Sequence, residues 1–348
     1  MILDAETYAL VPGVKALLAG AEGRELPGLF KTELHASIVE LNTGICASVD
    51  ETRTALRTLR KTAAEIAQAE GMVIAAAGTH PFSRAEDQQV VQEERYKSFL
   101  AYGGVSVRRQ AVNGLHVHVG VESADACFHA LEGMLPWLPV VLALSANSPY
   151  ADGIQTGLAS NRAEVLAQLP RAGAPPAFDS YADWEVFVER FVAAGVAEDY
   201  TRFWWDARPH PKFGTVEVRM PDQPTALART LAFVALLQAL AATALERPLP
   251  SGRAGRRGDY AQNRWAALRF GPRAELIHPD AARLVSVDDL AAELLELVRP
   301  AATTLGGAAF LAELDGAPSE ADLQIAVGGS AGLRAAAADL VERTVVSE

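Results

Sequence analysis

Two histidines and a glutamate–arginine pair occur at alternate positions of two short segments. Residues two apart on a β-strand point to the same side, so His116 and His118 in LHVHVG share one face of an expected strand. In TVEVRM the same rule places Thr215, Glu217 and Arg219 on one face. Imidazole binds metal ions or phosphate, glutamate offers the hard oxygen that Mg²⁺ prefers, and arginine grips phosphate through its planar fork. The two segments together predict a site for a metal ion and a phosphate group.

Each segment also has a simpler interpretation. The histidines can be two half-exposed side chains, and Glu217 with Arg219 can be an ion pair on a solvated strand, worth under about 1 kcal/mol. Gly114 and Gly120, at the two ends of the histidine segment, would let a bulky ligand approach the backbone closely. Their presence, and the occurrence of both segments in one chain, favour the binding site.

A third acidic element lies in KTELHASIVELNTG, where Glu33 and Glu40 are seven residues apart in an otherwise apolar stretch. Buried carboxylates need a partner. A helix would place both on one side, whereas a continuous strand would place them on opposite sides unless a turn near residues 35–37 reorients the first. The sequence leaves these arrangements open, and two exposed glutamates at element ends explain it as well as a metal site does.

The elements that must position these residues mix helices and strands. The spacing of apolar residues predicts helices over 49–70, 123–135 and 181–194, and a core helix over the Ala-rich run 230–245, which is too short to span a bilayer. Strands are expected for VIAAAG from Val73 and for the two alternating segments. Loops rich in proline and glycine are expected at 148–157, 169–178 and 208–214.

The C-terminal third reads as mostly Ala- and Leu-rich helix, and SGRAGRRGD at 251–259 reads as a solvated loop whose arginines could contact a phosphate. There are no regular βαβ units, and the alternating strands have one polar face, as in antiparallel sheets with one side on the core. The predicted class is therefore α+β. A chain of 348 residues can form one large domain or two lobes, and we treat residues 1–348 as a single domain.

Composition excludes several classes of protein. The net charge of −12 argues against binding to nucleic acid or an anionic membrane, which requires a positive field. The two cysteines, Cys46 and Cys127, suit a reducing compartment, and MILDAETYALVPG has no export signal, so we expect a cytoplasmic protein. The sequence lacks a GxxxxGK[ST] loop, a GxGxxG motif after a strand and a GxSxG motif, which removes P-loop, Rossmann and α/β-hydrolase enzymes from consideration.

A family resemblance covers most of the chain, in order from about residue 3 to 271. Its motifs are GTHPF at 78, EERY at 93, GLHVHVG at 114, SANSPY at 145, SNR at 160 and WDARPHPKFGTVEVR at 205. Together they resemble the type 2 glutamate–cysteine ligases, which are bacterial carboxylate–amine ligases. That family is similar to glutamine synthetase in its catalytic domain. The resemblance implies an antiparallel sheet curved into a funnel, with helices on its outer face and divalent ions and ATP phosphates on its polar face.

The resemblance also implies roles for individual residues. The expected metal ligands are Glu33, Glu40, His116 and Glu217, and the residues expected to face the ATP phosphates and act in catalysis are His118 and Arg219. Weaker candidates for cofactor or substrate contacts, each as readily structural, are Asn147, Arg162 and Arg208. The implied reaction needs ATP and Mg²⁺: the γ-carboxylate of glutamate attacks ATP to give an acyl phosphate, which an amine, typically that of cysteine, displaces.

One departure from the family concerns the start of the chain. Family members begin with a strand carrying a GxExE-type acidic motif, whereas this sequence starts at MILD, which reads like the end of that strand. We favour a start at an internal methionine over a shortened chain or a real loss of metal ligands. The alternatives to the ligase are an enzyme with another amine acceptor or carboxylate donor, and a non-catalytic nucleotide- or metabolite-binding homologue. The C-terminal helices could pack on a second subunit, and we favour a homodimer.

Overall fold

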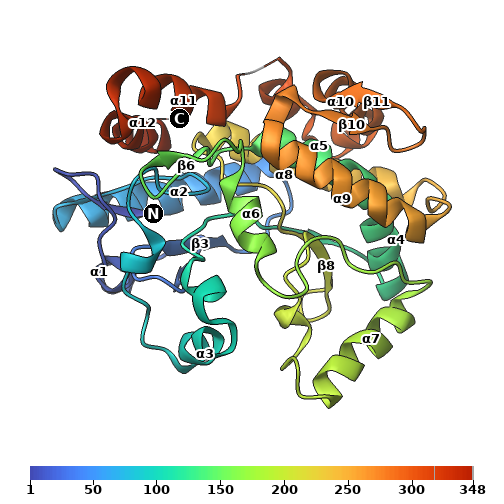
Figure 1. The fold of residues 1–348 in the computed structure, drawn as a ribbon, viewed down its shortest axis with the longest axis horizontal. Coiled ribbons are helices and arrows are strands. Elements are labelled where there is room, and N and C mark those ends of the chain that lie inside the picture. The colour runs from blue at the N-terminus through green and yellow to red at the C-terminus, as the bar shows by residue number, and fades with distance from the viewer. Residues whose placement is uncertain (317, 347–348) are drawn as a thin grey trace.

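The computed structural model describes residues 1–316 and 318–346 and is mostly helical, with small antiparallel sheets (Figure 1). This confirms the predicted α+β class. The first strand and the last helix lie together, because Met1 and Leu3 share a small apolar cluster with Ala337 and Leu340. The two ends of the described chain are therefore packed into one body.

The predicted helices are present with nearly the expected bounds. The α-helices are α1 (Val14–Ala21), α2 (Val49–Ala69), α3 (Glu94–Arg108), α4 (Ala124–Met134), α5 (Leu138–Ser145), α6 (Asn161–Ala167), α7 (Tyr181–Ala193), α8 (Leu227–Leu245), α9 (Arg253–Phe270), α10 (Val287–Thr304), α11 (Glu320–Ala331) and α12 (Leu333–Val346). The start of α2 shows how local interactions define a helix end. Ser48 caps α2 by accepting a hydrogen bond from the Glu51 amide, and Asp50 and Glu51 complement the helix dipole.

The strands are short and fall into separate antiparallel sheets. They are β1 (Ile2–Asp4), β2 (Gly28–Thr32), β3 (Val39–Thr43), β4 (Met72–Ile74), β5 (Val117–Gly120), β6 (Tyr150–Ala151), β7 (Ile154–Gln155), β8 (Ala207–His210), β9 (Thr215–Val218), β10 (Glu275–Ile277) and β11 (Leu284–Ser286). The pairs are β1–β4, β2–β3, β6–β7 and β10–β11, and the largest sheet has the order β5–β9–β8. Within the described residues the expected funnel is therefore not one continuous hydrogen-bonded sheet.

The β5–β9–β8 sheet contains His118 and Glu217 from the two chemistry-bearing segments, while His116 lies one residue before β5 and Arg219 one residue after β9. His118 pairs with Glu217, and Glu217 pairs on its other side with Arg208, so these three residues form one row across the sheet. The opposite face packs into the core, where Val216 and Val218 are fully buried. The alternation predicted from the sequence is confirmed, and it gives the sheet one polar face and one apolar face.

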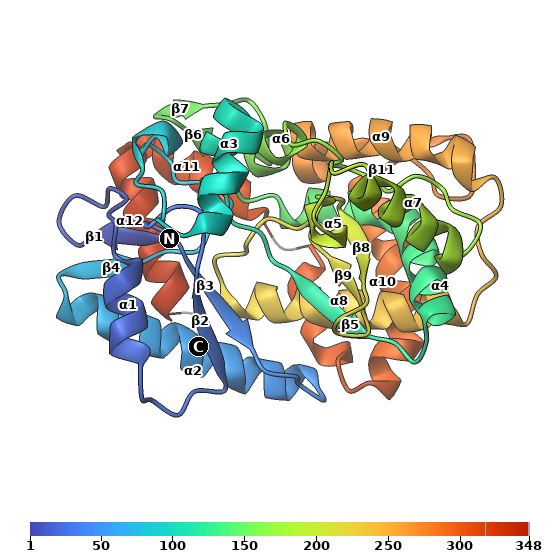
Figure 2. The same ribbon diagram turned by 90° about the horizontal axis from the view of Figure 1, so that it is seen from below.

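Helices α2 and α8 form a layer against the β2–β3 hairpin and the β5–β9–β8 sheet. Helix α2 packs against β3, helix α8 packs against β5, and the two helices pack against each other. Figure 2 shows α2 and α8 along the same side of the β2–β3 hairpin and β5. The helices thus connect two sheets that share no backbone hydrogen bonds.

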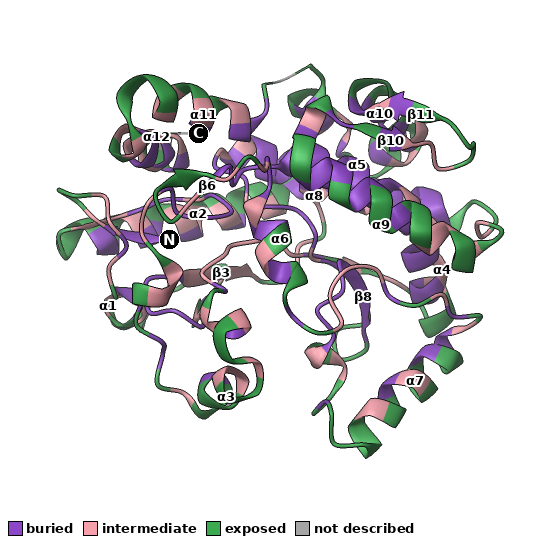
Figure 3. Ribbon diagram, in the orientation of Figure 1, coloured by how far each residue is buried: buried purple, intermediate pink, exposed green. Residues whose placement is uncertain are grey.

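The main core surrounds α4, α5 and α8, and Figure 3 shows burial concentrated there, while α7 at the edge is mostly exposed. Two described segments, Ala124–Ser145 and Leu227–Leu245, are long and apolar enough to cross a membrane by composition alone. Their most apolar stretches are 83% and 72% buried inside the fold, as expected of core helices. The predicted core helix at 230–245 is part of α8.

Two expectations about local structure were wrong. The expected loop 208–214 contains most of β8, because Pro209 lies on an edge strand, where a missing backbone N–H leaves the ladder intact. The expected solvated loop 251–259 instead forms the start of α9 from Arg253 onward. Its arginines had suggested a solvent-exposed loop, but ion pairs with distant parts of the chain hold this segment as a helix against the protein.

Candidate active site

A cavity of about 1310 Å³ is lined by residues of the β2–β3 hairpin, the β5–β9 strands, α2 and α8. Most of the residues singled out in the sequence line it: Glu33, Glu40, His116, His118, Arg162, Glu217 and Arg219. Asn147 and Arg208 are not in its lining. The fold therefore brings three segments that are far apart in sequence to one cavity.

Glu33 and Glu40 meet because the chain turns between β2 and β3. The hairpin pairs Lys31 with Glu40, and Glu33 follows Lys31 by two residues, so both carboxylates lie on one side. A turn at Ala36 and Ser37 produces this reversal, which is the strand-with-turn arrangement that the sequence left open. Burial, and then the charge of Glu40, raise the pKa of Glu33 to about 7. Such a carboxyl pair is suited to sharing a cation.

Glu217 lies at the centre of an ion-pair network. Its Oε2 accepts a hydrogen bond from Arg208 Nε at 2.6 Å, and its Oε1 accepts one from Arg219 Nη1 at 2.5 Å. Burial raises its pKa, but the two arginines, with His116 and His118, outweigh burial and bring the pKa well below the usual range. Glu217 is therefore ionised, and both of its oxygens have partners.

The two histidines are neutral bases beside this network. His118 Nδ1 lies 2.9 Å from Thr215 Oγ1, and its Nε2 lies 3.8 Å from Glu217 Oε1. The His116 ring makes no hydrogen bond with the residues that the structure describes. Burial is the main cause that lowers the pKa of both, and Arg219 lowers that of His116 further. Neutral imidazoles can accept a hydrogen bond or bind a metal ion.

Arg219 is the cationic group best placed to meet a ligand. One nitrogen donates to Glu217, while its buried Nε has no hydrogen-bond partner among the described residues. Its backbone N–H donates to the Asp206 carbonyl at 2.8 Å, which fixes the chain just beyond β9. A buried unpaired guanidinium donor beside a cavity is suited to an anionic group.

Arg162, Asn147 and Arg208 are bonded mainly to the protein itself. Arg162 donates to the carbonyls of Met220 and Arg219 at 2.7 and 2.8 Å, while Arg208 Nη1 donates to the carbonyls of Thr201 and Phe203.

Asn147 is fully buried, and its side chain bonds to Gln223, Thr225 and Gln324. Ligand contacts for Asn147, Arg162 and Arg208 stay predictions, and the geometry favours structural roles, most clearly for Asn147 and Arg208, which lie outside the cavity lining.

Comparison with known proteins identifies the family. Residues 1–317 match the family described as Glutamate-cysteine ligase family 2 (GCS2). The chain belongs to this family. A Rubrobacter xylanophilus protein named "Putative glutamate–cysteine ligase 2-1" is 40% identical over 307 residues, covering 88% of this chain and 81% of that protein. A second protein of that organism, "Putative glutamate–cysteine ligase 2-3", is 40% identical over 333 residues, covering 94% and 89%.

The fold also matches solved structures at low sequence identity. A crystal structure of the glutamate–cysteine ligase GshA from Francisella tularensis in complex with AMP superposes with a TM-score of 0.73. It is 14% identical, and the match covers 99% of this chain and 86% of that chain. The family resemblance drawn from the sequence motifs is thus confirmed, and the similarity in fold extends over the whole chain.

In this GCS2 chain the predicted metal ligands are only partly assembled. No three His, Cys, Asp or Glu side chains within 1–316 and 318–346 converge closely enough to hold a metal ion. The Glu33–Glu40 pair fits a divalent cation, since its carboxylates repel each other and line the cavity. Glu217 fits less well as a ligand in this arrangement, because two arginines occupy its oxygens. The metal role of the four residues stays a prediction.

Three family motifs have structural roles that sequence reasoning missed. From EERY, Tyr96 donates to the Thr32 carbonyl and Glu93 accepts from the Thr32 hydroxyl, both at 2.7 Å, which holds the chain next to Glu33. Asp222 is fully buried and accepts hydrogen bonds from Ser148 and Ser160 at 2.6 and 2.8 Å.

These serines belong to the SANSPY and SNR motifs, so the motifs themselves were the available signal. Both networks support the cavity wall from behind.

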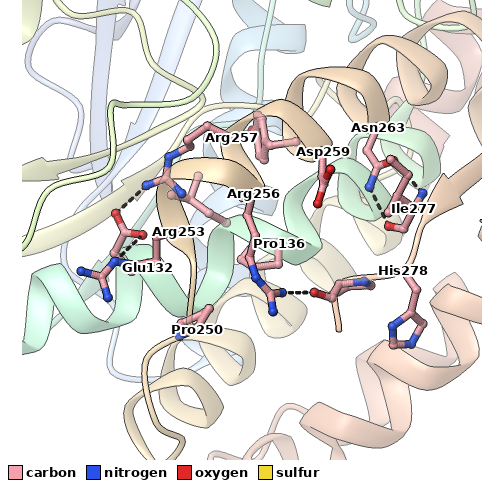
Figure 4. Close-up of a pocket in the computed structure, with 13 residues that line it drawn as sticks. Glu132, Pro136, Pro250, Arg253, Arg256, Arg257, Asp259, Asn263, Ile277 and His278 are labelled. Atoms are coloured by element: carbon pink, nitrogen blue, oxygen red, sulfur yellow. Dashed lines mark hydrogen bonds and ion pairs between the residues drawn. The ribbon is translucent and has the colours of Figure 1, made fainter. Parts of the chain in front are cut away.

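The arginines of 251–259 lie in a second, small pocket away from these residues. Arg257 and Arg253, in the first turns of α9, pair with the buried Glu132 of α4 at 2.5 and 3.6 Å (Figure 4). Arg256 is directed to the Pro279 carbonyl instead. Because these arginines already have partners in the protein, the pocket serves helix packing, and the arginines are neither solvated, as the sequence had suggested, nor free to contact a phosphate.

Proposed function

We propose that this chain is an ATP- and Mg²⁺-dependent carboxylate–amine ligase that joins the γ-carboxylate of glutamate to the amino group of cysteine. Membership of GCS2 and the names of its relatives support the reaction class and both substrates. The observation that carries the proposal is the meeting of Glu33 and Glu40 with Arg219 at one cavity, so that a cation and a phosphate can be bound together.

The reaction proceeds in two steps. A carboxylate oxygen of glutamate attacks the γ-phosphorus of ATP, the bond to the ADP oxygen breaks, and an acyl phosphate forms. The amine nitrogen then attacks the carbonyl carbon, phosphate leaves with the bonding electron pair, and the amine loses a proton. Bound Mg²⁺ would neutralise charge on the phosphates.

The chain's own residues have distinct roles in this proposal. Arg219 orients the transferring phosphoryl group and stabilises its charge, and Glu217 orients Arg219. The neutral imidazole of His118 is available to donate to a phosphate oxygen. Apolar side chains in the cavity lining keep water from the acyl phosphate.

The proposal also covers the shape of the sheet, the cellular compartment and the oligomeric state. We propose that the β2–β3 hairpin and the β5–β9–β8 sheet act as two parts of one curved antiparallel surface with α2 and α8 on its outer face. The shared helical layer supports this idea. We further propose a cytoplasmic, homodimeric enzyme, in keeping with the acidic, cysteine-poor sequence.

A second candidate is a nucleotide-binding protein without turnover. It is favoured by one observation: Glu217, an expected metal ligand, has both oxygens paired with arginines. Under this alternative the cavity binds a nucleotide, but the cations needed for phosphoryl transfer are not held in place.

The deciding experiment measures phosphate release from ATP with Mg²⁺ and glutamate, alone and with cysteine or other amines. The 348-residue chain is compared with one extended by any in-frame codons upstream of Met1, since Met1 lines the cavity and added residues would begin at its wall. Release that depends on the amine in either protein supports the ligase. Nucleotide binding without release in both supports the second candidate.

Site variants connect the activity to the cavity. Glu217→Ala and His116→Ala should abolish phosphate release and weaken nucleotide and metal binding, whereas Glu296→Ala, on the exposed face of α10, should change neither. Unchanged ATP and metal binding in the first two variants would contradict the assignment of this cavity as the active site.

A further inference from the structure

The turn between β8 and β9 carries an aromatic side chain that the proposed reaction does not use. Phe213 follows His210, Pro211 and Lys212, and it lines the large cavity. Its backbone is fixed, because the Phe213 amide donates to the His210 carbonyl at 3.1 Å and the Gly214 amide donates to the Pro211 carbonyl at 3.2 Å. Gly214 has φ +63°, a conformation that favours glycine. The ring therefore projects from a rigid turn.

One face of the Phe213 ring is covered by His210, the His118 ring also contacts it, and more than half of the side chain is exposed. The His210 ring stacks on it with centroids 4.3 Å apart and planes 14° from parallel. His210 itself is buried and has the Tyr200 ring against its edge. Phe213, by contrast, is 59% exposed. A single exposed apolar residue is common on protein surfaces, so the exposure matters here only because the ring is stacked, immobile and at the cavity.

The position of Phe213 relative to Arg219 suits a ligand that contacts both. Strand β9 lies between them in the chain, but the Arg219 guanidinium turns back to Glu217, whose Oε1 is 3.8 Å from His118 Nε2. The Phe213 and Arg219 side chains are therefore closer together than the strand is long, and a nucleotide bent along this row can contact both. If the γ-phosphate lies at Arg219, the base reaches the turn. His118 lies between these points and contacts Phe213 edge to face at 5.5 Å.

We propose that Phe213, backed by His210, is the stacking platform for the purine base of the bound nucleotide. This inference rests on the proposed function, because it takes the phosphate end of the nucleotide to be at Arg219. Aromatic side chains stack on nucleic acid bases with little need for base-specific hydrogen bonds. Phe213 is then a binding residue that sets affinity for the nucleoside part of ATP and leaves the phosphate contacts unchanged.

The test compares two ligands by calorimetry in the presence of Mg²⁺: ATP, and inorganic tripolyphosphate, which has no base. Phe213→Ala should weaken ATP binding roughly tenfold to a hundredfold, in line with the loss of one stacked base, and change tripolyphosphate binding less than twofold. Phe213→Trp should bind ATP like the wild type. Phe213→Leu, which keeps apolar volume without a π face, should behave like Phe213→Ala.

The control variant is Trp265→Ala, which removes an aromatic residue that is 52% exposed on α9 and outside the cavity lining. It should bind both ligands normally. Equal weakening of both ligands by Phe213→Ala, or full ATP affinity in Phe213→Leu, would overturn the platform while leaving the ligase proposal standing. An altered KM for the amine with unchanged ATP affinity would also overturn it and assign the ring to the acceptor. Failure of the wild type to bind ATP would overturn both proposals.

Discussion

A Cβ atom on Gly114 would lie 2.1 Å from Nη2 of Arg162, so the two residues fit together only because position 114 has no side chain. The guanidinium of Arg162 is buried there and donates to the carbonyls of Arg219 and Met220. Gly114 also forms a β-bridge with Asp222. The glycine that begins the histidine motif is thus needed to hold the far end of β9, where Arg219 projects into the cavity.

Gly114→Ala should therefore lower the free energy of unfolding by about 1–3 kcal/mol, because the added methyl group overpacks a buried guanidinium that is held by hydrogen bonds to two carbonyls. Urea denaturation measures the change. Gly120→Ala, at the other end of the same motif, is the matched control, because a Cβ there meets nothing within 4 Å. Equal stability of the two variants would show that Arg162 moves freely and does not fix β9.

The Glu33–Glu40 pair should bind a divalent cation. Mg²⁺ or Mn²⁺ at a hundred times its dissociation constant should stabilise the wild type by about 2.7 kcal/mol, visible as a raised Tm. The double variant Glu33→Gln, Glu40→Gln should lose this response while remaining folded without metal, since it removes like-charge repulsion. Glu22→Gln with Glu25→Gln, outside the cavity lining, should retain it. A full cation response in the first double variant would place the cation elsewhere.

His80 of the GTHPF motif should make stability depend on pH. Its Nε2 donates to the Tyr8 carbonyl, and its Nδ1 accepts from the Phe82 and Ser83 amides, an arrangement that requires a neutral ring. Burial lowers its pKa from 6.5 to about 4. Below pH 6.5 the His80 side chain of the unfolded chain binds a proton, whereas that of the folded chain stays neutral down to about pH 4. The free energy of unfolding therefore falls as the pH falls from 6.5 to about 4.

His80→Gln removes this titration. Its unfolding free energy should lie below that of the wild type at pH 7, and the difference should narrow by about 3 kcal/mol between pH 7 and pH 4. Urea denaturation at several pH values gives both curves. Other histidines titrate equally in both proteins, so parallel curves would mean that folding does not lower the pKa of His80.

The buried ion pair of the small pocket should be far more important for stability than an exposed one. Arg257→Met leaves the fully buried Glu132 carboxylate with only the more distant Arg253, so we expect a loss of about 3 kcal/mol. Arg273→Met breaks an exposed pair with Asp322 and should cost about 1 kcal/mol or less. Thermal unfolding of both variants makes the comparison. Similar losses would show that water screens the Glu132 pocket.

Much of the site could be predicted from local sequence. Alternation in LHVHVG and TVEVRM placed His118 and Glu217 on one polar face, because side-chain direction in a strand depends only on residue parity. The meeting of Glu33 with Glu40 could only be offered as one option, because it depends on where the chain turns.

The ion-pair partners of these residues could not be predicted from local sequence. Arg208 reaches Glu217 through the register of β8 on β9, and register is set by tertiary packing. Because proline is uncommon in strands, Pro209 led the sequence analysis to predict a loop where β8 lies. The arginines of 251–259 looked solvated because their acidic partner, Glu132, is more than a hundred residues away. In each case a contact between distant segments decided the outcome.

The described residues after the family match, which ends at residue 317, are an integral part of the fold. Glu320 of α11 accepts hydrogen bonds from the backbone amides of Thr225 and Ala226 at the start of α8, and Gln324 bonds to Asn147. The backbone that leads into the central helix of the core is thus held by a segment that the family model does not match. Anyone trimming the gene to the family boundary for expression would remove these contacts, and should expect a less stable product even though every predicted site residue is retained.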